Sequence, residues 1–117
     1  MIHVYLDDWR SSPLGFALAK NASECILMLE ECEVDILSLD HDLGYRVQET
    51  GMDVVHWIIR TGRFPRRIYI HTSSPSAGSN MYQMLYSSKP EHVEVHPTKI
   101  PEDLLEQIAI QHRLGAS

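Results

Sequence analysis

Short apolar runs alternate along this chain with segments whose apolar residues recur at helical spacing. Each apolar run ends at polar or turn-forming residues, which is typical of strands. The pattern predicts strands over residues 2–6, 16–19, 35–39, 67–71 and 92–95. It predicts helices over residues 22–32, 51–60, 79–88 and 101–112.

Capping residues support the predicted helix boundaries. Asn21 precedes the first helix and Glu24 follows three residues later, as in a capping box. Thr50 can cap the second helix and Gly62 can end it. Pro101 suits the first position of the last helix. Between Thr72 and Ser79 the sequence predicts only a Ser/Pro/Gly loop.

Alternating strands and helices predict an α/β fold: a three-layer arrangement around a mainly parallel five-stranded sheet. In such sheets ligands bind beyond the carboxyl ends of the strands. The loops that begin at Asp7, Asp40, His71 and His96 should open on that edge.

The length of 117 residues fits a single domain spanning residues 1–117. The composition, 44% hydrophobic and 22% charged, carries no bias toward disorder. We expect no membrane association, because no apolar run is long enough. Cys25 and Cys32 lie two helical turns apart, too far for a disulfide, and suit buried thiols in a reducing cytoplasm.

A formal net charge of −6 argues against generic DNA binding. It leaves room for a phosphate-bearing ligand, because a bound metal can reverse the local charge. The expected partner is a phosphate-bearing small molecule or an RNA end. The oligomeric state is left open.

Three predicted strands end in bursts of polar residues, and two of these bursts carry paired carboxylates. Carboxylates brought together repel one another unless a cation lies between them, which favours a divalent metal. The predicted metal ligands are Asp7, Asp8, Asp40 and Asp42. Carboxylate oxygens suit Mg²⁺, Mn²⁺ or Ca²⁺, whereas a histidine ligand favours Mn²⁺, Fe²⁺ or Zn²⁺. The alternative is that these aspartates serve only turns and caps.

Histidines supply the candidate acid/base groups. His71 closes a strand and opens a loop rich in hydroxyls, so it suits a metal ligand or a general acid/base. His41 is a second candidate, although strand alternation can also turn it toward the core.

Candidate phosphate contacts follow the same strand ends. They are Arg10, Arg46, Thr72, Ser73, Asn80 and Lys99. The densest basic cluster, at residues 60–67, belongs to the opposite edge and is interpreted as a solvated patch.

Four segments together resemble the cyclic-phosphate-processing receiver-like family, a relative of the receiver domains of two-component signalling. They are Leu6-Asp7-Asp8-Trp9-Arg10, Ser38-Leu39-Asp40-His41-Asp42-Leu43-Gly44, Thr50-Gly51-Met52-Asp53-Val54-Val55, and His71-Thr72-Ser73-Ser74-Pro75 with Asn80-Met81. The resemblance implies a flavodoxin-like order of five strands.

The resemblance also implies roles for residues at the carboxyl edge. Mg²⁺ would bind at Asp7 and Asp8, and Asp40 matches the position that accepts a phosphoryl group in receivers. Thr72 or Ser73 matches the receiver hydroxyl residue, and Lys99 is the candidate lysine. One departure stands out: the stretch between Asp8 and Asn21 is too short for a full first helix, so we expect a truncated first crossover made of coil.

The leading hypothesis is a metal-dependent phosphoesterase that processes a cyclic phosphate, with Mg²⁺ or Mn²⁺ as cofactor and Asp40, His41 and His71 as catalytic candidates. The alternative is a non-catalytic module. It would either accept a phosphoryl group at Asp40 or sequester a cyclic nucleotide by stacking on Trp9 or Tyr45.

Overall fold

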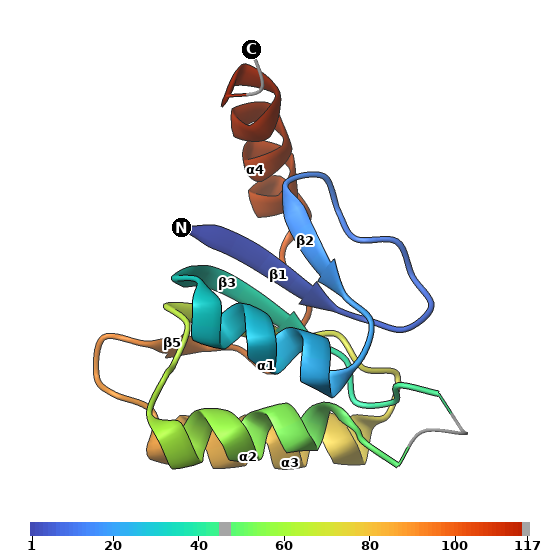
Figure 1. Cartoon of the computed structure of the whole chain (residues 1–117), viewed down its shortest axis with the longest axis vertical. Helices are drawn as coiled ribbons and strands as arrows, with labels where there is room; N and C mark the ends of the chain where they lie inside the picture. The colour runs from blue at the N-terminus through green and yellow to red at the C-terminus, as the bar shows by residue number, and fades with distance from the viewer. Residues whose placement is uncertain (45–47, 116–117) are drawn as a thin grey trace.

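The computed structural model describes residues 1–44 and 48–115 (Figure 1). The strands are β1 (Ile2–Leu6), β2 (Phe16–Ala19), β3 (Val34–Leu39), β4 (Arg67–Ile70) and β5 (Glu94–Val95). The helices are α1 (Ala22–Glu31), α2 (Gly51–Thr61), α3 (Pro75–Ser88) and α4 (Glu102–Gly115). The sheet order is β2-β1-β3-β4-β5, with every neighbouring pair parallel. The predicted three-layer α/β fold and its flavodoxin-like strand order are therefore confirmed.

Strand alternation divides the core into two clusters. Residues such as Leu6, Leu39 and Ile70 face α1, α2 and α3 and are buried in the larger cluster. On the other face a smaller cluster joins Ile36 and Tyr69 to α4. Figure 1 shows the same division, with α1, α2 and α3 gathered on one side of the sheet and α4 standing on the other.

The first crossover, residues 7–15 between β1 and β2, contains no helix. This confirms the predicted coil. The crossover returns along the sheet and packs against α4 at Gly15, which has a positive φ of 94°. A Cβ at this position would lie 2.8 Å from Cγ2 of Ile108, so the close contact and the backbone both favour glycine. With no helix in the first crossover, α4 is the one helix that packs on this face of the sheet within residues 1–44 and 48–115.

The third helix begins earlier than the sequence pattern predicted. It starts at Pro75 rather than at residue 79, because Pro75 takes the first helical turn, where its missing N–H costs no hydrogen bond. The hydroxyl of Thr72 accepts a hydrogen bond from the N–H of Ser74 and orders the entry to the helix. Most of the predicted Ser/Pro/Gly loop is thus the first turn of α3.

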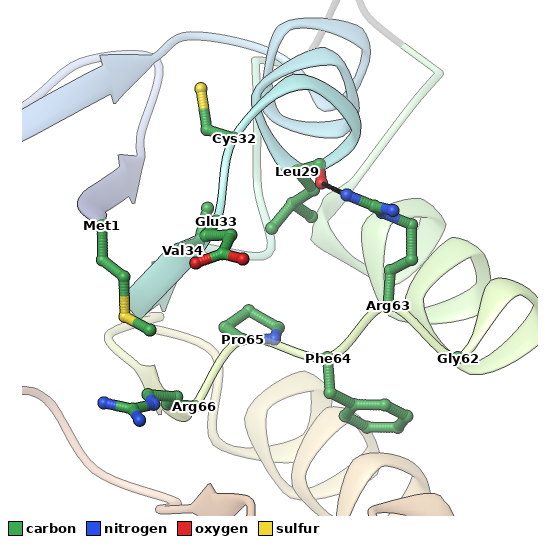
Figure 2. Close-up of a pocket in the computed structure, with 10 residues that line it drawn as sticks. All are labelled: Met1, Leu29, Cys32, Glu33, Val34, Gly62, Arg63, Phe64, Pro65 and Arg66. Carbon is green, nitrogen blue, oxygen red and sulfur yellow. Dashed lines mark hydrogen bonds between the residues drawn. The ribbon is translucent and has the colours of Figure 1, made fainter.

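At the opposite edge of the sheet, two residues of the predicted basic cluster make structural contacts, whereas Arg60 and Arg66 are exposed as expected of a solvated patch. Figure 2 shows Arg63 reaching the main-chain carbonyl oxygen of Leu29, at 3.0 Å, near the end of α1. Arg67 forms an ion pair of 3.1 Å with Asp35. The cavity drawn in Figure 2, about 310 Å³ in volume, lies at this edge, away from the carboxyl ends of the strands.

Both cysteines are free, and burial raises the pKa of the Cys25 thiol to about 12. Among residues 1–44 and 48–115, no helix has the length and apolar character that a membrane span requires.

Candidate functional site

Three residues directly after parallel strands meet at the carboxyl edge of the sheet: Asp7 after β1, Asp40 after β3 and His71 after β4. Each continues the sheet ladder, since its backbone N–H donates to the neighbouring strand, at Ala19, Leu6 and Leu39 respectively. The ladder holds the three backbones in place. Their side chains follow the alternation of Tyr5, Ser38 and Tyr69, so they share the face on which α4 packs.

These three side chains form a compact group. One carboxylate oxygen from each aspartate and one ring nitrogen of His71 all lie within 4.8 Å of one another. Asp7 and Asp40 are buried, with 0% and 5% of their surface exposed. Two buried carboxylates this close repel each other unless positive charge or hydrogen bonds compensate.

Asp7 is saturated with hydrogen bonds. Its Oδ1 accepts from the backbone N–H groups of Trp9 and Arg10, both at 2.9 Å. Its Oδ2 accepts from Nη1 of Arg10 at 2.8 Å and from Nε2 of His71 at 3.1 Å. Oδ2 of Asp40 lies 3.6 Å from the same Nη1, so one guanidinium serves both carboxylates.

His71 is held on three sides. An ionised Asp7 can only accept hydrogen bonds, so Nε2 of His71 carries a proton. Nδ1 then accepts from the hydroxyl of Ser38, at 2.5 Å. The imidazole also stacks on Tyr5, with ring centroids 4.3 Å apart and planes 7° from parallel. These contacts set both the orientation of the ring and its tautomer.

The environment shifts the three pKa values in different directions. Burial acts to raise the pKa of Asp7, but the hydrogen bonds from Arg10, Trp9 and His71 outweigh it and hold that pKa below its usual value. Burial and the charge of Asp7 raise the pKa of Asp40. Burial lowers the pKa of His71 despite the opposing effect of Asp7, so the imidazole is neutral near pH 7.

The sequence model of the cyclic-phosphate processing receiver domain family matches residues 2–87 of the chain. The chain belongs to this family. Among solved structures, the chain is similar to the receiver domain of the Francisella response regulator 1452, with a TM-score of 0.56 and 13% sequence identity over 96% of each chain. At that identity the similarity shows the fold alone. No curated protein matches the chain.

This receiver domain does not bring all four predicted metal ligands together. Asp8 is exposed, because the strand has ended and the chain bends away from the sheet directly after Asp7. Asp42 is 69% exposed, and its Oδ1 lies 3.1 Å from Nδ1 of His41. The chain leaves the sheet after Asp40, so strand alternation no longer applies and Asp42 does not share the face of Asp40.

The predicted phosphate contacts are spread around the rim. Arg10 touches both carboxylates, and Lys99 lines the same cavity as Arg10. The hydroxyl of Thr72 is engaged by the N–H of Ser74, and Ser73 is exposed. Asn80 is exposed on α3 and lies beyond its first turn, because the helix begins at Pro75. Two candidates, Tyr45 and Arg46, lie outside the described residues.

Sequence reasoning missed the support of His71 by Ser38 and Tyr5. A signal was present, because Ser38 is a polar residue inside the apolar run of β3, two positions before Asp40. A buried hydroxyl needs a hydrogen-bond partner, and a residue two positions from a site residue shares its face of the sheet.

The donor set of this receiver domain fits a divalent metal. Asp7 and Asp40 offer carboxylate oxygens, which suit Mg²⁺ or Mn²⁺. His71 would add a nitrogen ligand, which suits Mn²⁺, Fe²⁺ or Zn²⁺, only after its Nε2 proton moves to Nδ1 and Ser38 becomes the acceptor. Oδ2 of Asp40 carries the weakest of the contacts described above, the 3.6 Å approach of Arg10. Because Asp7 is saturated, a metal ion would have to displace the Arg10 side chain or His71 from its Oδ2.

Proposed function

We propose that this receiver domain is a metal-dependent phosphoesterase that processes a cyclic phosphate, either a cyclic nucleotide or the 2′,3′-cyclic end of an RNA. The observation that carries the proposal is the group of Asp7, Asp40 and His71 in a chain of the cyclic-phosphate processing receiver family. An acid pair with a neutral histidine offers the charge and the proton-transfer group that phosphoester cleavage needs.

Asp7 and Asp40 are the proposed metal ligands, with Mg²⁺ or Mn²⁺ as the expected ion. When bound, such an ion polarises phosphoryl oxygens and lowers the pKa of a coordinated water. The raised pKa of Asp40 reflects the cost of the second buried negative charge, and a divalent ion would remove that cost.

His71 is the proposed general acid/base. Nε2–H of His71 donates a hydrogen bond to Asp7, and the hydroxyl of Ser38 donates to Nδ1, so the imidazole holds one proton at a defined atom. His71 is a better candidate than His41, because the His41 ring lies against the exposed carboxylate of Asp42. Arg10 already reaches both carboxylates and, with Lys99, would bind the phosphate.

A phospho-accepting receiver remains the second candidate. Asp40 follows β3 in a receiver fold, and Lys99 lies at the same cavity as Arg10. In that case Asp40 would form a phosphoaspartate, and His71 would not take part in the transfer.

Two substitutions separate these functions. Asp40→Asn keeps the side-chain shape but removes the charge, so Mn²⁺ binding and turnover of 2′,3′-cyclic nucleotides should both be lost. His71→Ala should retain Mn²⁺ at the carboxylates while turnover falls by about 10²–10⁴-fold. His71→Gln, which keeps a donor for Asp7, should be as inactive if the role is proton transfer. Glu106→Gln, exposed on α4, is the matched control.

The readouts are hydrolysis, Mn²⁺ affinity by calorimetry, and labelling by a small-molecule phosphodonor. Wild-type protein that is labelled at Asp40 but hydrolyses no cyclic phosphate would favour the phospho-accepting receiver. A wild-type protein that turns over no cyclic phosphate with Mg²⁺ or Mn²⁺ contradicts the proposed phosphoesterase.

A further inference from the structure

A cavity of about 350 Å³ opens directly beside the Asp7–Asp40–His71 group. Its floor is the sheet, where it is lined by Tyr5, Ser38 and His71. This is the face on which the truncated first crossover supplies no helix. The cavity therefore lies where a full-length crossover helix would otherwise cover the sheet.

The cavity and the carboxylate group form one continuous site. Arg10 and His71 line the cavity, and both also donate hydrogen bonds to Asp7. A ligand in the cavity would thus have one end at the guanidinium and imidazole that border the two carboxylates.

The lining is chemically divided. Arg10 and Lys99 bring two positive charges, which suit a phosphate. Pro13, Ile100 and Leu105 bring apolar surface, and the Tyr5 ring brings an aromatic one. Glu102 adds a carboxylate that can accept hydrogen bonds from amino or hydroxyl groups. A charged end, an apolar wall and a hydrogen-bond acceptor together match a nucleoside with an attached phosphate.

Size and charge favour a single nucleotide over an RNA chain. Cavities that hold small ligands begin at about 300 Å³, so this one has room for one compact ligand. A net charge of −6 would repel the phosphates of a longer strand, which need several basic contacts.

We propose that this cavity binds the nucleoside of a 2′,3′-cyclic mononucleotide, with its phosphate at Arg10 and Lys99. The inference rests on the proposed function, because it names the substrate class of the same site. Lys99, Ile100 and Leu105 then act as specificity residues, and all three lie outside the residues that the family model matches.

The test fills the cavity from α4. Leu105→Trp should obstruct it, whereas Leu104→Trp is the matched control, because Leu104 is the neighbouring half-buried leucine and does not line the cavity. Lys99→Gln, at an exposed position, tests the phosphate contact without disturbing the core. Binding of 2′,3′-cyclic AMP and of a short oligoribonucleotide with a 2′,3′-cyclic end is measured by calorimetry in EDTA, and turnover of the same two ligands is measured separately with Mn²⁺. Thermal melts establish that each variant is folded.

Leu105→Trp and Lys99→Gln should each raise the dissociation constant for the mononucleotide by about tenfold or more, and Leu104→Trp by less than about twofold. The oligoribonucleotide should bind more weakly than the mononucleotide. Equal or tighter binding of the oligoribonucleotide, unchanged binding by folded Leu105→Trp protein, or no binding by wild-type protein would each overturn the inference. If the wild-type protein binds the mononucleotide but does not hydrolyse it, and Leu105→Trp abolishes that binding, the cavity inference is supported and the proposed phosphoesterase function is contradicted. If Leu105→Trp leaves turnover unchanged, the phosphoesterase function is supported and the cavity inference is contradicted.

Discussion

Arg10 supplies the positive charge beside the two buried carboxylates, Asp7 and Asp40. Its guanidinium is 2.8 Å from Asp7 and 3.6 Å from Asp40. Arg10→Gln leaves two like charges at close range and should lower the free energy of unfolding by about 1–2 kcal/mol, less than for a fully buried pair because Arg10 is 43% exposed. Urea denaturation without metal measures this loss.

The same variant should respond more strongly to metal. Without the guanidinium, Mn²⁺ meets the full negative charge of Asp7 and Asp40, so saturating Mn²⁺ should stabilise Arg10→Gln protein more than wild-type protein. Arg66→Gln, exposed at the opposite edge, should change neither quantity. If Arg10→Gln and wild-type proteins gain equally from Mn²⁺, Arg10 does not compete with the ion.

At the residue scale the sequence predicted that side chains from three strand ends would come together, but not which of the four aspartates would do so. Asp7, Asp40 and His71 follow apolar runs, and parallel pairing brings such positions to one edge. Asp8 and Asp42 were grouped with them but lie outside the compact group of side chains, because their placement depends on where the backbone leaves the sheet. That departure is a tertiary feature that residue type and spacing do not encode.

At the scale of the elements, the start of α2 supports the backbone at Asp40. Gly51 lies so close to this backbone that a Cβ would fall 2.0 Å from the carbonyl oxygen of Asp40. Its N–H also donates to the carbonyl of His41, at 2.9 Å. The helix terminus and the site loop therefore pack as one unit.

Gly51→Ala should push the start of α2 away from the loop that carries Asp40. The clash is with backbone, so either α2 or the Asp40 loop must move, and we expect a loss of about 1–3 kcal/mol in unfolding free energy. Mn²⁺ affinity should fall as well, because Asp40 shifts. Gly115→Ala is the control, since a Cβ there meets nothing within 4 Å. Denaturation and calorimetry measure both effects, and a Gly51→Ala protein as stable as wild type would contradict the argument.

Element boundaries were predictable where caps mark them. Asn21 and Thr50 cap α1 and α2 as the sequence predicted, each accepting a hydrogen bond from a backbone N–H in the first turn. The predicted start of α3 was wrong, because Ser, Pro and Gly also favour loops and only packing distinguishes a loop from a first helical turn. Gly78 is buried, and a Cβ there would lie 3.0 Å from Cγ2 of Thr72, so the close packing of the first turns of α3 favours glycine at this position.

At the scale of the whole molecule, the short first crossover leaves the two sheet faces unequal. In the part of the chain that the structure describes, α1, α2 and α3 cover one face and α4 alone packs on the other, where the carboxylates, His71 and the cavity all lie. The sequence predicted the missing helix from length alone. It did not predict the cavity, because that depends on how α4 and residues 99–105 pack over the exposed part of the sheet.

His3 lies on this same face and links it to the pH dependence of stability. Its side chain packs on Phe16, with ring centroids 5.2 Å apart, and among the described residues Nδ1 has no hydrogen-bond partner. Burial lowers the pKa of His3 below 6.5; Asp35 opposes the shift, whereas Arg67 and the N-terminal amine add to it. The folded protein therefore binds the proton less readily than the unfolded chain.

The sign of the pH effect follows from this lowered pKa. Above pH 6.5 His3 is neutral in both the folded and the unfolded state, so its full contribution to stability is present. As the pH falls below 6.5, the unfolded state takes up the proton first. The contribution of His3 to stability is then lost until the pH passes the lower pKa of the folded state. His71 has a lowered pKa and acts in the same direction. His3→Phe should therefore lose less stability than wild type between pH 7.5 and pH 5.5, with the part due to His71 remaining. His56→Phe, exposed on α2, is the control and should retain the wild-type difference. Urea midpoints at the two pH values measure the effect, and an unchanged difference in His3→Phe protein would show that His3 is protonated equally in both states.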